Sequence, residues 1–271
     1  MNEVKPKPYA GVALLAKTFQ MLDLFQIETP TWTQVDLVRA TNLNRSTVNR
    51  LVRYLVSTGY LVQLASSGKY SLGLAAINLG HRANASFDFR SLCQPALEKL
   101  AALIDETIIL TSYDRTNNTS VCVDQIARKH GALRVFERVG STFPLHAGAA
   151  PKAILASLPE QDRETIIAGT LKKYTKNTMI DIEVLEADIA ATIDRGYSLS
   201  WEETYEGIAG IGAPVMGPDA LPLGSIAVAL PIQRVEPGTI EYIGKTLLKV
   251  TSAIITGDDM ELVEDDAGVI L

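Results

Sequence analysis

Apolar residues near the start of the chain recur at three- and four-residue steps, which is the spacing of one face of an α-helix. The pattern predicts three helices, at residues 11–25, 33–40 and 45–57. Thr33 and Asp36 have the spacing of a capping box at the start of the second helix, with Asp in place of Glu. Asn42 suits a tight turn after it, and Asn44 or Ser46 can cap the third helix. This arrangement is typical of a helix-turn-helix.

The pattern changes to short strand-like runs after the third helix, where Gly59 occupies the position of a C-terminal cap. Two strands are predicted at residues 60–64 and 69–72, joined by a polar turn. A helical pattern follows at residues 74–90. We therefore predict a winged helix-turn-helix domain at residues 1–73 and a linker helix at 74–90.

Residues from 91 onwards mix helical and strand patterns, which predicts the α/β (α+β) fold class. Helices are predicted at residues 92–105, 149–158, 160–169, 181–195 and 241–256. Strands are predicted at residues 107–114, 120–126, 197–201, 208–215 and 224–230. These elements form one predicted domain at residues 91–257, and an acidic tail follows at 258–271.

Charge is unevenly distributed along the chain. The formal net charge is −6, but residues 1–85 hold nine basic and four acidic residues, a net charge of +5. The other 186 residues hold 16 basic and 27 acidic residues, a net charge of −11. A small basic domain joined to a larger acidic one favours one module that binds a polyanion and another with a different task.

The sequence lacks the apolar segments of a membrane protein and of a secreted one. The chain is 47% hydrophobic, yet it has no apolar run of the ~18–20 residues that a membrane span needs. Residues 1–9 are polar and contain proline, unlike the apolar core of a signal peptide. We expect a cytoplasmic protein with no membrane partner, whose Cys93 and Cys122 are reduced and buried.

Enzymatic chemistry is not favoured by the residues that would carry it. Cys122 with His130 or His146 is the candidate thiol–imidazole pair, but sequence shows no contact between them and Cys122 lies in a strand-like run. The histidines and cysteines have no metal-ligand spacing. We expect a solvated loop at Glu202, Glu203 and Glu206. We therefore expect no catalytic residue, no metal and no cofactor.

The third predicted helix has an apolar and a polar face, as a recognition helix requires. The residues that share the apolar face are Val48, Leu51, Val52, Leu55 and Val56. Because Arg and Asn can bond bidentately to guanine and adenine, the predicted base-reading residues are Arg45, Thr47, Asn49 and Arg50. The other predicted DNA contacts, to phosphates and at the wing, are Thr33, Asn44, Ser46, Arg53 and Lys69.

An alternative function stays open at this point, since amphipathic helix pairs with polar outer faces also occur in proteins that bind no DNA. The chain would then be a small-molecule sensor or enzyme whose helix-turn-helix docks protein. The basic outer face of residues 45–53 favours DNA. Loss of binding at high salt would separate the two functions.

Several motifs resemble the isocitrate-lyase-regulator (IclR) family. In the first part they are Asn44-Arg-Ser-Thr-Val-Asn-Arg-Leu-Val52, Ser57-Thr-Gly-Tyr-Leu61 and Gly68-Lys-Tyr-Ser-Leu-Gly73. In the second they are Gly140-Ser-Thr-Phe-Pro-Leu-His-Ala-Gly-Ala-Ala-Pro-Lys-Ala-Ile-Leu155, Arg195-Gly-Tyr197 and Gly207-Ile-Ala-Gly-Ile-Gly-Ala-Pro-Val215. The resemblance implies a winged helix-turn-helix, a linker helix and a GAF-like mixed-sheet effector domain. It also implies homodimers or homotetramers on paired half-sites of double-stranded operator DNA.

The resemblance also implies where a small-molecule effector binds. Family members that bind small oxoacids hold the carboxylate over a helix start, which matches Ala149 and Ala150. Four further pocket positions match Ser200, Gly210, Ala227 and Ala229, where those members have Asp, Cys, Ser and Ser. Pro151 also departs from the family's Gly.

Loss of these polar groups predicts a roomier, drier pocket, because a buried hydrophilic acid would be left short of partners. Its apolar wall is predicted at Val135, Phe143 and Ile208, and Phe143 and Trp201 are predicted to stack on the ligand. The effector is then an aromatic or hydrophobic carboxylic acid, and the regulator controls a catabolic operon. The alternative is that Gly210, Ala227 and Ala229 are only packing changes.

Overall fold

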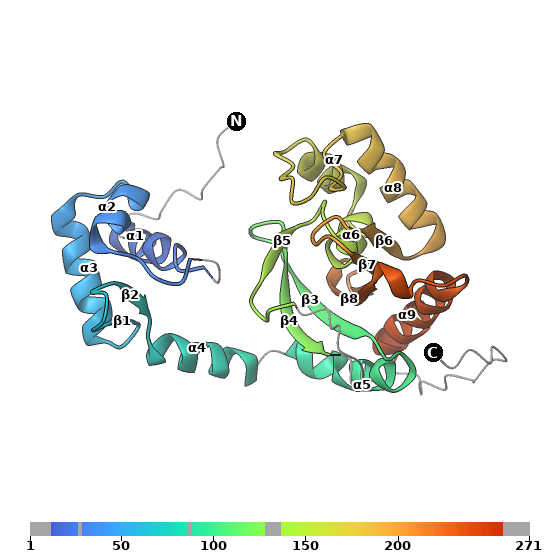
Figure 1. Cartoon of the computed structure of the whole chain (residues 1–271), viewed down its shortest axis with the longest axis horizontal. Helices are drawn as coiled ribbons and strands as arrows, with labels where there is room; N and C mark the ends of the chain where they lie inside the picture. The colour runs from blue at the N-terminus through green and yellow to red at the C-terminus, as the bar shows by residue number, and fades with distance from the viewer. Residues whose placement is uncertain (1–11, 27–28, 86–87, 128–136, 257–271) are drawn as a thin grey trace. The chain divides into compact units, whose positions relative to one another are not determined.

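The chain folds into two compact units, Met1–Phe87 and Asp88–Leu271, each taken by itself below (Figure 1). The computed structural model describes residues 12–26, 29–85, 88–127 and 137–256. Two residues that carried expectations, His130 and Val135, lie outside these ranges, as does the acidic tail.

The first unit is a winged helix-turn-helix, as predicted. Its helices are α1 (Ala13–Leu22), α2 (Gln34–Thr41), α3 (Arg45–Ser57) and α4 (Leu74–Ala85). Its strands are β1 (Leu61–Gln63) and β2 (Tyr70–Leu72), which pair antiparallel. The wing is therefore shorter at both strands than the sequence pattern predicts.

Side-chain caps fix the turn between α2 and α3. The amide of Asp36 donates to the Thr33 hydroxyl at 3.2 Å, and that hydroxyl donates to the Asp36 carboxylate at 2.6 Å. Asn42 has a φ of 52°, in the left-handed region. The amide of Thr47 donates to Asn44 Oδ1 at 2.8 Å. The Thr33 cap of α2, the turn and one of the two predicted caps of α3 are thus confirmed. The capping box is incomplete, because the Asp36 carboxylate accepts from the Thr33 hydroxyl rather than from the Thr33 amide.

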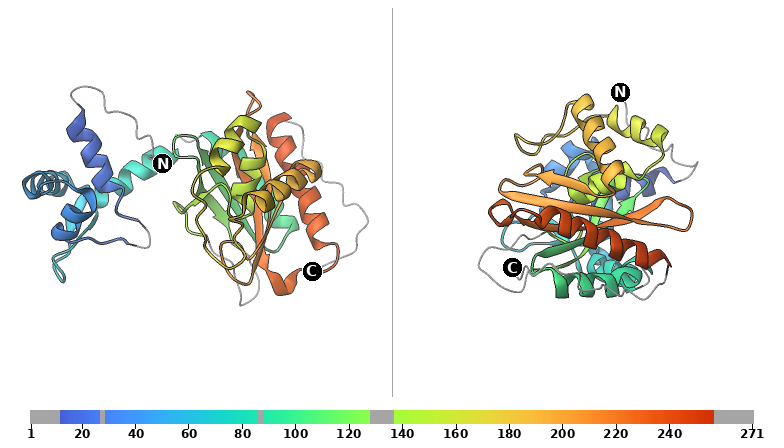
Figure 2. Two further views of the ribbon diagram at one scale, coloured as in Figure 1. Left: turned by 90° about the horizontal axis from the view of Figure 1, so that it is seen from above. Right: turned by 90° about the vertical axis from the view of Figure 1, so that its right-hand side faces the viewer.

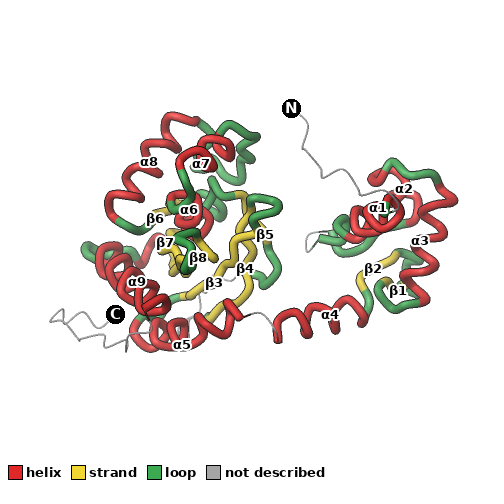
Figure 3. Tube along the Cα trace, turned by 180° about the vertical axis from the view of Figure 1, so that it is seen from behind, coloured by secondary structure: helices red, strands yellow, loops and turns green. Residues whose placement is uncertain are grey.

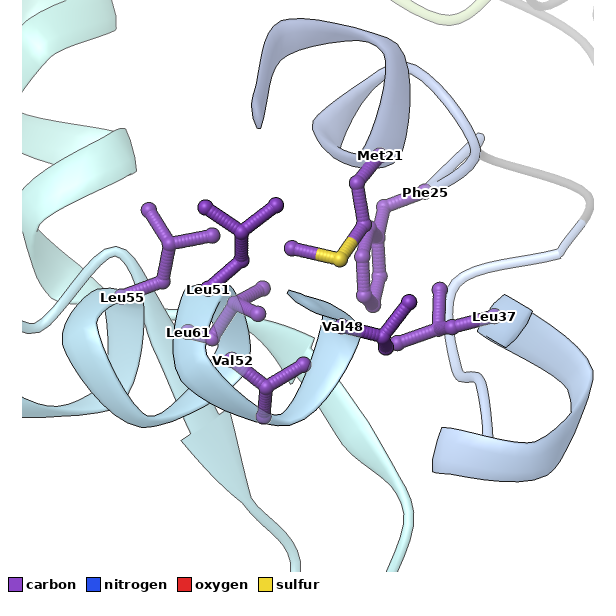
Figure 4. Close-up of a cluster of buried hydrophobic side chains, with 8 residues drawn as sticks. All are labelled: Met21, Phe25, Leu37, Val48, Leu51, Val52, Leu55 and Leu61. Carbon is purple, nitrogen blue, oxygen red and sulfur yellow. The ribbon is translucent and has the colours of Figure 1, made fainter. Parts of the chain in front are cut away.

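The core of the first unit collects the apolar faces of its elements around α3 (Figure 4). The buried side chains are Met21, Phe25, Leu37, Val48, Leu51, Val52, Leu55 and Leu61. Burial of each large apolar side chain contributes roughly 1.5–3 kcal/mol. Val56 was predicted on the buried face but is 38% exposed. It lies one residue beyond Leu55, where the helix has turned away from the core.

The second unit is built on a six-stranded sheet in the order β5-β4-β3-β8-β7-β6. Its strands are β3 (Thr107–Asp114), β4 (Thr119–Ile126), β5 (Thr142–Pro144), β6 (Ser198–Trp201), β7 (Ile208–Met216) and β8 (Pro222–Pro231). The α/β fold class is confirmed. One detail differs, since every pairing between the described strands is antiparallel rather than mixed.

Helices cover both faces of this sheet (Figure 2, right; Figure 3). On one face lie α5 (Asp88–Leu103) and α9 (Thr239–Thr256), which pack on each other and on β3 and β7. On the other lie α6 (Ala149–Ala156), α7 (Glu160–Ile167) and α8 (Ile182–Arg195). Helix α6 contacts β3, β6, β7 and β8 directly. The start of α6 therefore lies against the sheet, where it positions the site described below.

Several predicted element boundaries were wrong, most of all those of α4 and α5. The helix expected at 74–90 ends at Ala85 in the described chain, and α5 begins at Asp88 rather than at residue 92. The strand β5 was not predicted, because it has only three residues and one of them is Pro144. A 3-10 turn, Ile232–Arg234, was also missed. No helix in the described ranges is both long enough and apolar enough to cross a membrane.

Candidate functional site

The outer face of α3 presents basic side chains to solvent. Arg45, Arg50 and Arg53 are exposed, and Thr47 and Asn49 are half-buried beside them. Within the described part of the chain, none of these three arginines has a carboxylate partner. Val48, Leu51 and Leu55 bury the opposite face. The helix thus holds three exposed cations without a carboxylate partner among the described residues, and its opposite face is packed in the core.

Three other predicted contact residues already have roles in the helix caps. Thr33 is bonded to Asp36, Asn44 caps α3, and the Ser46 hydroxyl donates to Asn44 Oδ1 at 2.9 Å. Their side-chain hydrogen bonds hold the turn together, so any contact with a ligand would be additional to that structural role. Lys69 is exposed directly before β2, next to the turn of the wing.

A cavity of about 70 Å³ lies between the start of α6 and the sheet. Most of the positions predicted for an effector line it together: Phe143, Ala149, Ala150, Ser200, Ile208, Gly210, Ala227 and Ala229. Trp201 does not line it. Successive strand residues point to opposite faces, so Ser200 faces the cavity and Trp201, which is 40% exposed, faces away.

A pocket that is roomier and drier than in the oxoacid-binding family members stays a prediction, since it concerns a difference from those members. At about 30 Å³ per water, the cavity of about 70 Å³ holds roughly two water molecules. Polar residues that the sequence did not single out also line it: Thr111, Ser120, Glu137, Thr204 and Tyr205. They come from β3, β4 and two loops. For these polar residues, only the alternation of Ile109 with Thr111 along β3 could have indicated in the sequence that they share one face of the sheet.

The start of α6 offers free amide groups to this cavity. Gly148 precedes the helix with a φ of 94°, and its amide donates to Glu203 Oε2 at 3.0 Å. In the described part of the chain, the next two amides, of Ala149 and Ala150, have no acceptor. Pro151 has no amide to give. Two N–H groups at the positive end of the helix dipole are suited to an anion.

Gly210 lies in close contact with the start of α6, beside these amides. A Cβ atom at this position would lie 3.0 Å from Ala149 Cβ, 3.6 Å from Ser200 Cβ and 3.9 Å from the Ala149 nitrogen. The absence of a side chain therefore lets the start of α6 approach β7 closely, beside the Ala149 amide and Ser200. The Ser200 hydroxyl is a third donor at this end of the cavity.

A buried ion pair joins α6 to two neighbouring segments close to the start of that helix. Lys152 is fully buried, and its Nζ lies 2.6 Å from Glu203 Oε1 and 2.7 Å from Asp188 Oδ2. Burial raises the pKa of Glu203, and the positive charge of Lys152 opposes that shift. The expectation of a solvated loop was therefore wrong for Glu203, which ties the loop carrying Thr204 and Tyr205 to α6 and α8.

Cys122 and His146, the candidate thiol–imidazole pair, are both in surroundings that disfavour their charged forms. Burial raises the pKa of the Cys122 thiol to about 12, and the negative charge of Glu137 adds to that shift. Burial lowers the pKa of His146, whose Nε2 lies 2.9 Å from the Lys172 carbonyl oxygen. Neither is arranged as an activated thiolate with its base. In the described ranges, no three His, Cys, Asp or Glu residues are grouped to hold a metal ion.

Two family models match the chain. One, described as the IclR helix-turn-helix domain, matches residues 14–65. The other, described as bacterial transcriptional regulator IclR C-terminal, matches residues 81–256. The HTH-type transcriptional regulator KipR of Bacillus subtilis (strain 168) is 32% identical over 216 residues, which cover 79% of this chain and 84% of that protein.

Solved structures have the same fold. An IclR transcriptional regulator from Alicyclobacillus acidocaldarius superposes with a TM-score of 0.79 at 22% identity, over 90% of this chain and 97% of that one. An IclR homolog from Microbacterium hydrocarbonoxydans, complexed with 4-hydroxybenzoate, gives a TM-score of 0.73 at 22% identity, over 91% and 100% of the two chains.

Proposed function

The chain belongs to the IclR family of bacterial transcriptional regulators, and from that membership we propose that it binds operator DNA through α3 and an organic acid in the cavity of its second unit. The resemblance seen in the sequence motifs is confirmed by the family models. The family is one of transcriptional regulators rather than enzymes. A protein that binds operator DNA would act in the bacterial cytoplasm.

The division of α3 into a buried apolar face and an exposed basic face is the observation that carries the DNA proposal. Arg45 and Arg50 are exposed on α3, and Thr47 and Asn49 are half-buried beside them. These side chains would read base edges in the major groove. Arg53, Lys69 and the capped starts of α2 and α3 would contact phosphates.

Salt dependence tests this proposal against docking of a protein. The logarithm of the DNA association constant should fall linearly with the logarithm of salt concentration, by roughly 0.9 per phosphate neutralised. We expect this slope to become shallower when Arg53 is replaced by alanine. The DNA used is that upstream of the gene. If binding to it is absent, or does not change with salt, the alternative of a sensor that docks protein is favoured.

The effector proposed for the cavity is an aromatic or hydrophobic carboxylic acid. Ala149, Ala150 and Ser200 would bind its carboxylate, and Phe143, Ile208 and the two strand alanines would contact its apolar body. The 4-hydroxybenzoate complex of the Microbacterium hydrocarbonoxydans homolog supports this class of ligand. A regulator that responds to such an acid would control an operon for its breakdown.

Binding an aromatic acid requires the cavity to widen beyond its volume of about 70 Å³. Tyr205, which is 44% exposed, borders the cavity and packs edge-on against Phe143 with ring centroids 6.1 Å apart. We propose that this ring moves aside when the acid enters. Calorimetry with glyoxylate, pyruvate and benzoate is the direct test, because the small acids fit the cavity without this movement. Tighter binding of glyoxylate or pyruvate than of benzoate would overturn the proposal.

Self-association is proposed from exposed apolar side chains in the first unit. Leu74 and Ile77 lie one helical turn apart on α4 and are 75% and 52% exposed. Leu15 and Phe19 are similarly placed on α1. A homodimer or homotetramer would cover such a surface and match two DNA half-sites. Sedimentation of the Ile77→Glu variant should show a smaller species than the wild type, and an unchanged species would contradict this role for α4.

A further inference from the structure

The free backbone donors at the start of α6 can be counted residue by residue. The first four N–H groups of a helix have no carbonyl partner inside it. At this helix they belong to positions 148 to 151. The amide that follows, of Lys152, donates to the Gly148 carbonyl at 3.1 Å and so begins the hydrogen bonds of the helix itself. These four positions therefore decide how many oxygens of an acid the helix start can bind.

Two of these four positions offer no donor to the cavity. The Gly148 amide donates to Glu203 Oε2 at 3.0 Å. Glu203 is 1% exposed, and its Oε1 lies 2.6 Å from Lys152 Nζ, so the carboxylate is fixed beside the Gly148 amide. Residue 151 is a proline and has no N–H. Its ring carbon Cδ takes the place of the hydrogen on that nitrogen, and the residue is buried and lines the cavity.

The donors that remain, on Ala149, Ala150 and Ser200, suit a flat group with two oxygens. The two amides are adjacent and, within the described ranges, have no acceptor. Ser200 is 5% exposed and lines the same cavity, and no described residue forms a hydrogen bond with its hydroxyl. A polar group buried without a partner costs free energy until a ligand or a water supplies one. This hydroxyl therefore indicates a polar ligand at the helix start, independently of the helix itself.

A tetrahedral oxyanion needs more donors than this helix start provides. Phosphate and sulfate groups bind helix starts through the successive N–H groups of the first turn. Here the third of those groups, after the amides of Ala149 and Ala150, is replaced by the Pro151 ring. No described residue that lines the cavity is Lys, Arg or His, so no cationic side chain among them offers a donor in its place. The third oxygen of such an anion would be buried against carbon, which is costly.

We propose that Pro151 is a specificity-determining residue: because it lacks an N–H, it restricts the anion site at the start of α6 to a planar carboxylate and disfavours tetrahedral oxyanions such as sulfonates and phosphates. The proposal rests on the function proposed above, since it assumes that the acid binds with its carboxylate at this helix start. It adds the geometry of the acid group that the site accepts, and it names the residue that sets this geometry.

The test uses two acids with the same ring and the same single charge. Calorimetry of the full chain with benzoate and benzenesulfonate compares a planar group of two oxygens with a tetrahedral group of three. Pro151→Ala restores the N–H and removes the outer ring carbons, whereas Pro151→Val restores the N–H and keeps as many side-chain carbons as proline has. Pro159→Ala is the matched control, because Pro159 is exposed at the start of α7 and does not line the cavity.

We expect the wild type and Pro159→Ala to bind benzoate at least about tenfold more tightly than benzenesulfonate. In both Pro151 variants that ratio should fall by about fivefold or more, because the new N–H bonds the third oxygen. A packing role alone would change both affinities alike and leave the ratio as it is in the wild type.

Three results would overturn the role of Pro151 while bound benzoate still supports the proposed function. They are an unchanged ratio in both variants, a wild type that does not prefer benzoate, and a ratio that falls in Pro151→Ala alone, since space rather than the missing N–H would then set the preference. If the wild type binds neither acid, both proposals fail.

Discussion

The recognition surface on α3 and the effector cavity are assembled in opposite ways. The recognition surface lies on a single 13-residue helix, α3, and the helical period alone decides which of its side chains face solvent. The cavity is lined by residues from six strands, α6 and three loops. We therefore expect the surface on α3 to tolerate change one residue at a time, whereas the cavity depends on contacts between segments far apart in the chain.

The largest expected effect tests whether the cavity depends on such a contact. Replacing Lys152 by methionine leaves Glu203 buried without its cation. We expect the second unit to lose about 3–5 kcal/mol of its free energy of unfolding. Urea denaturation followed by tryptophan fluorescence can isolate this unit, because Trp201 is its tryptophan once Trp32 of the first unit is replaced by phenylalanine.

Lys173→Met serves as the control for that experiment, since Lys173 is exposed in the same unit. It should change the free energy of unfolding by no more than about 0.5 kcal/mol. Equal stability of the Lys152 and Lys173 variants would mean that the buried pair does not support the cavity.

The next effect tests the recognition surface on α3. Removing one base-reading arginine by Arg50→Ala should weaken operator binding by ~1–3 kcal/mol, while the fold of the first unit is unchanged because Arg50 is exposed. Fluorescence anisotropy of labelled operator DNA measures the loss. Lys173→Ala, in the second unit, is the matched loss of one charge and should leave the affinity unchanged. If the two variants bind equally well, Arg50 does not read a base.

A smaller effect separates the two regions within one experiment. Gly210→Ala adds a methyl group beside Ala149 and Ser200, and should weaken binding of a carboxylic acid by on the order of 1 kcal/mol. Operator affinity in the absence of acid should not change. Gly80→Ala adds the same methyl group to open space on α4. Calorimetry that shows the same acid affinity in both variants would place the anion elsewhere.

The smallest effect concerns pH. Burial holds the pKa of His146 below its ordinary value of 6.5, and its contact with the Lys172 carbonyl only partly opposes this. The neutral ring is favoured in the folded state, so its contribution to stability is complete above the unfolded pKa and is lost as pH falls through the folded one. The urea midpoint of the second unit should therefore drop on acidification below about 6.5. His146→Gln should reduce this drop, and an identical pH profile would contradict the assignment.

Sequence reasoning was most complete for the first unit, since its structure follows from local chemistry. The Thr33–Asp36 box, the left-handed Asn42 and the Asn44 cap are all contacts within four residues. Each can be recognised from residue type and spacing alone. The one error in the apolar face, Val56, came from extending the face one residue too far.

The cavity was only partly predictable. Ala227 and Ala229 were placed together because strand alternation is local, and the other family-matched positions that the structure describes also line it. Trp201 was predicted to stack on the ligand, but it follows Ser200 directly along β6 and so faces away from the cavity that Ser200 lines. Glu137, Tyr205 and the Lys152–Glu203 pair could not have been found, since each contact joins residues between 51 and 68 positions apart in the chain.

A single titration tests operator binding by α3 and effector binding in the cavity together. Fluorescence anisotropy of the wild type on the DNA upstream of its own gene, with excess competitor DNA, should show specific binding that weakens with salt. Adding a hydroxybenzoate should then shift the operator affinity, and Gly210→Ala should blunt that shift without changing the affinity of the acid-free protein. Specific DNA binding that no aromatic acid alters would contradict the proposed effector, and the absence of specific binding would contradict the account of α3 itself.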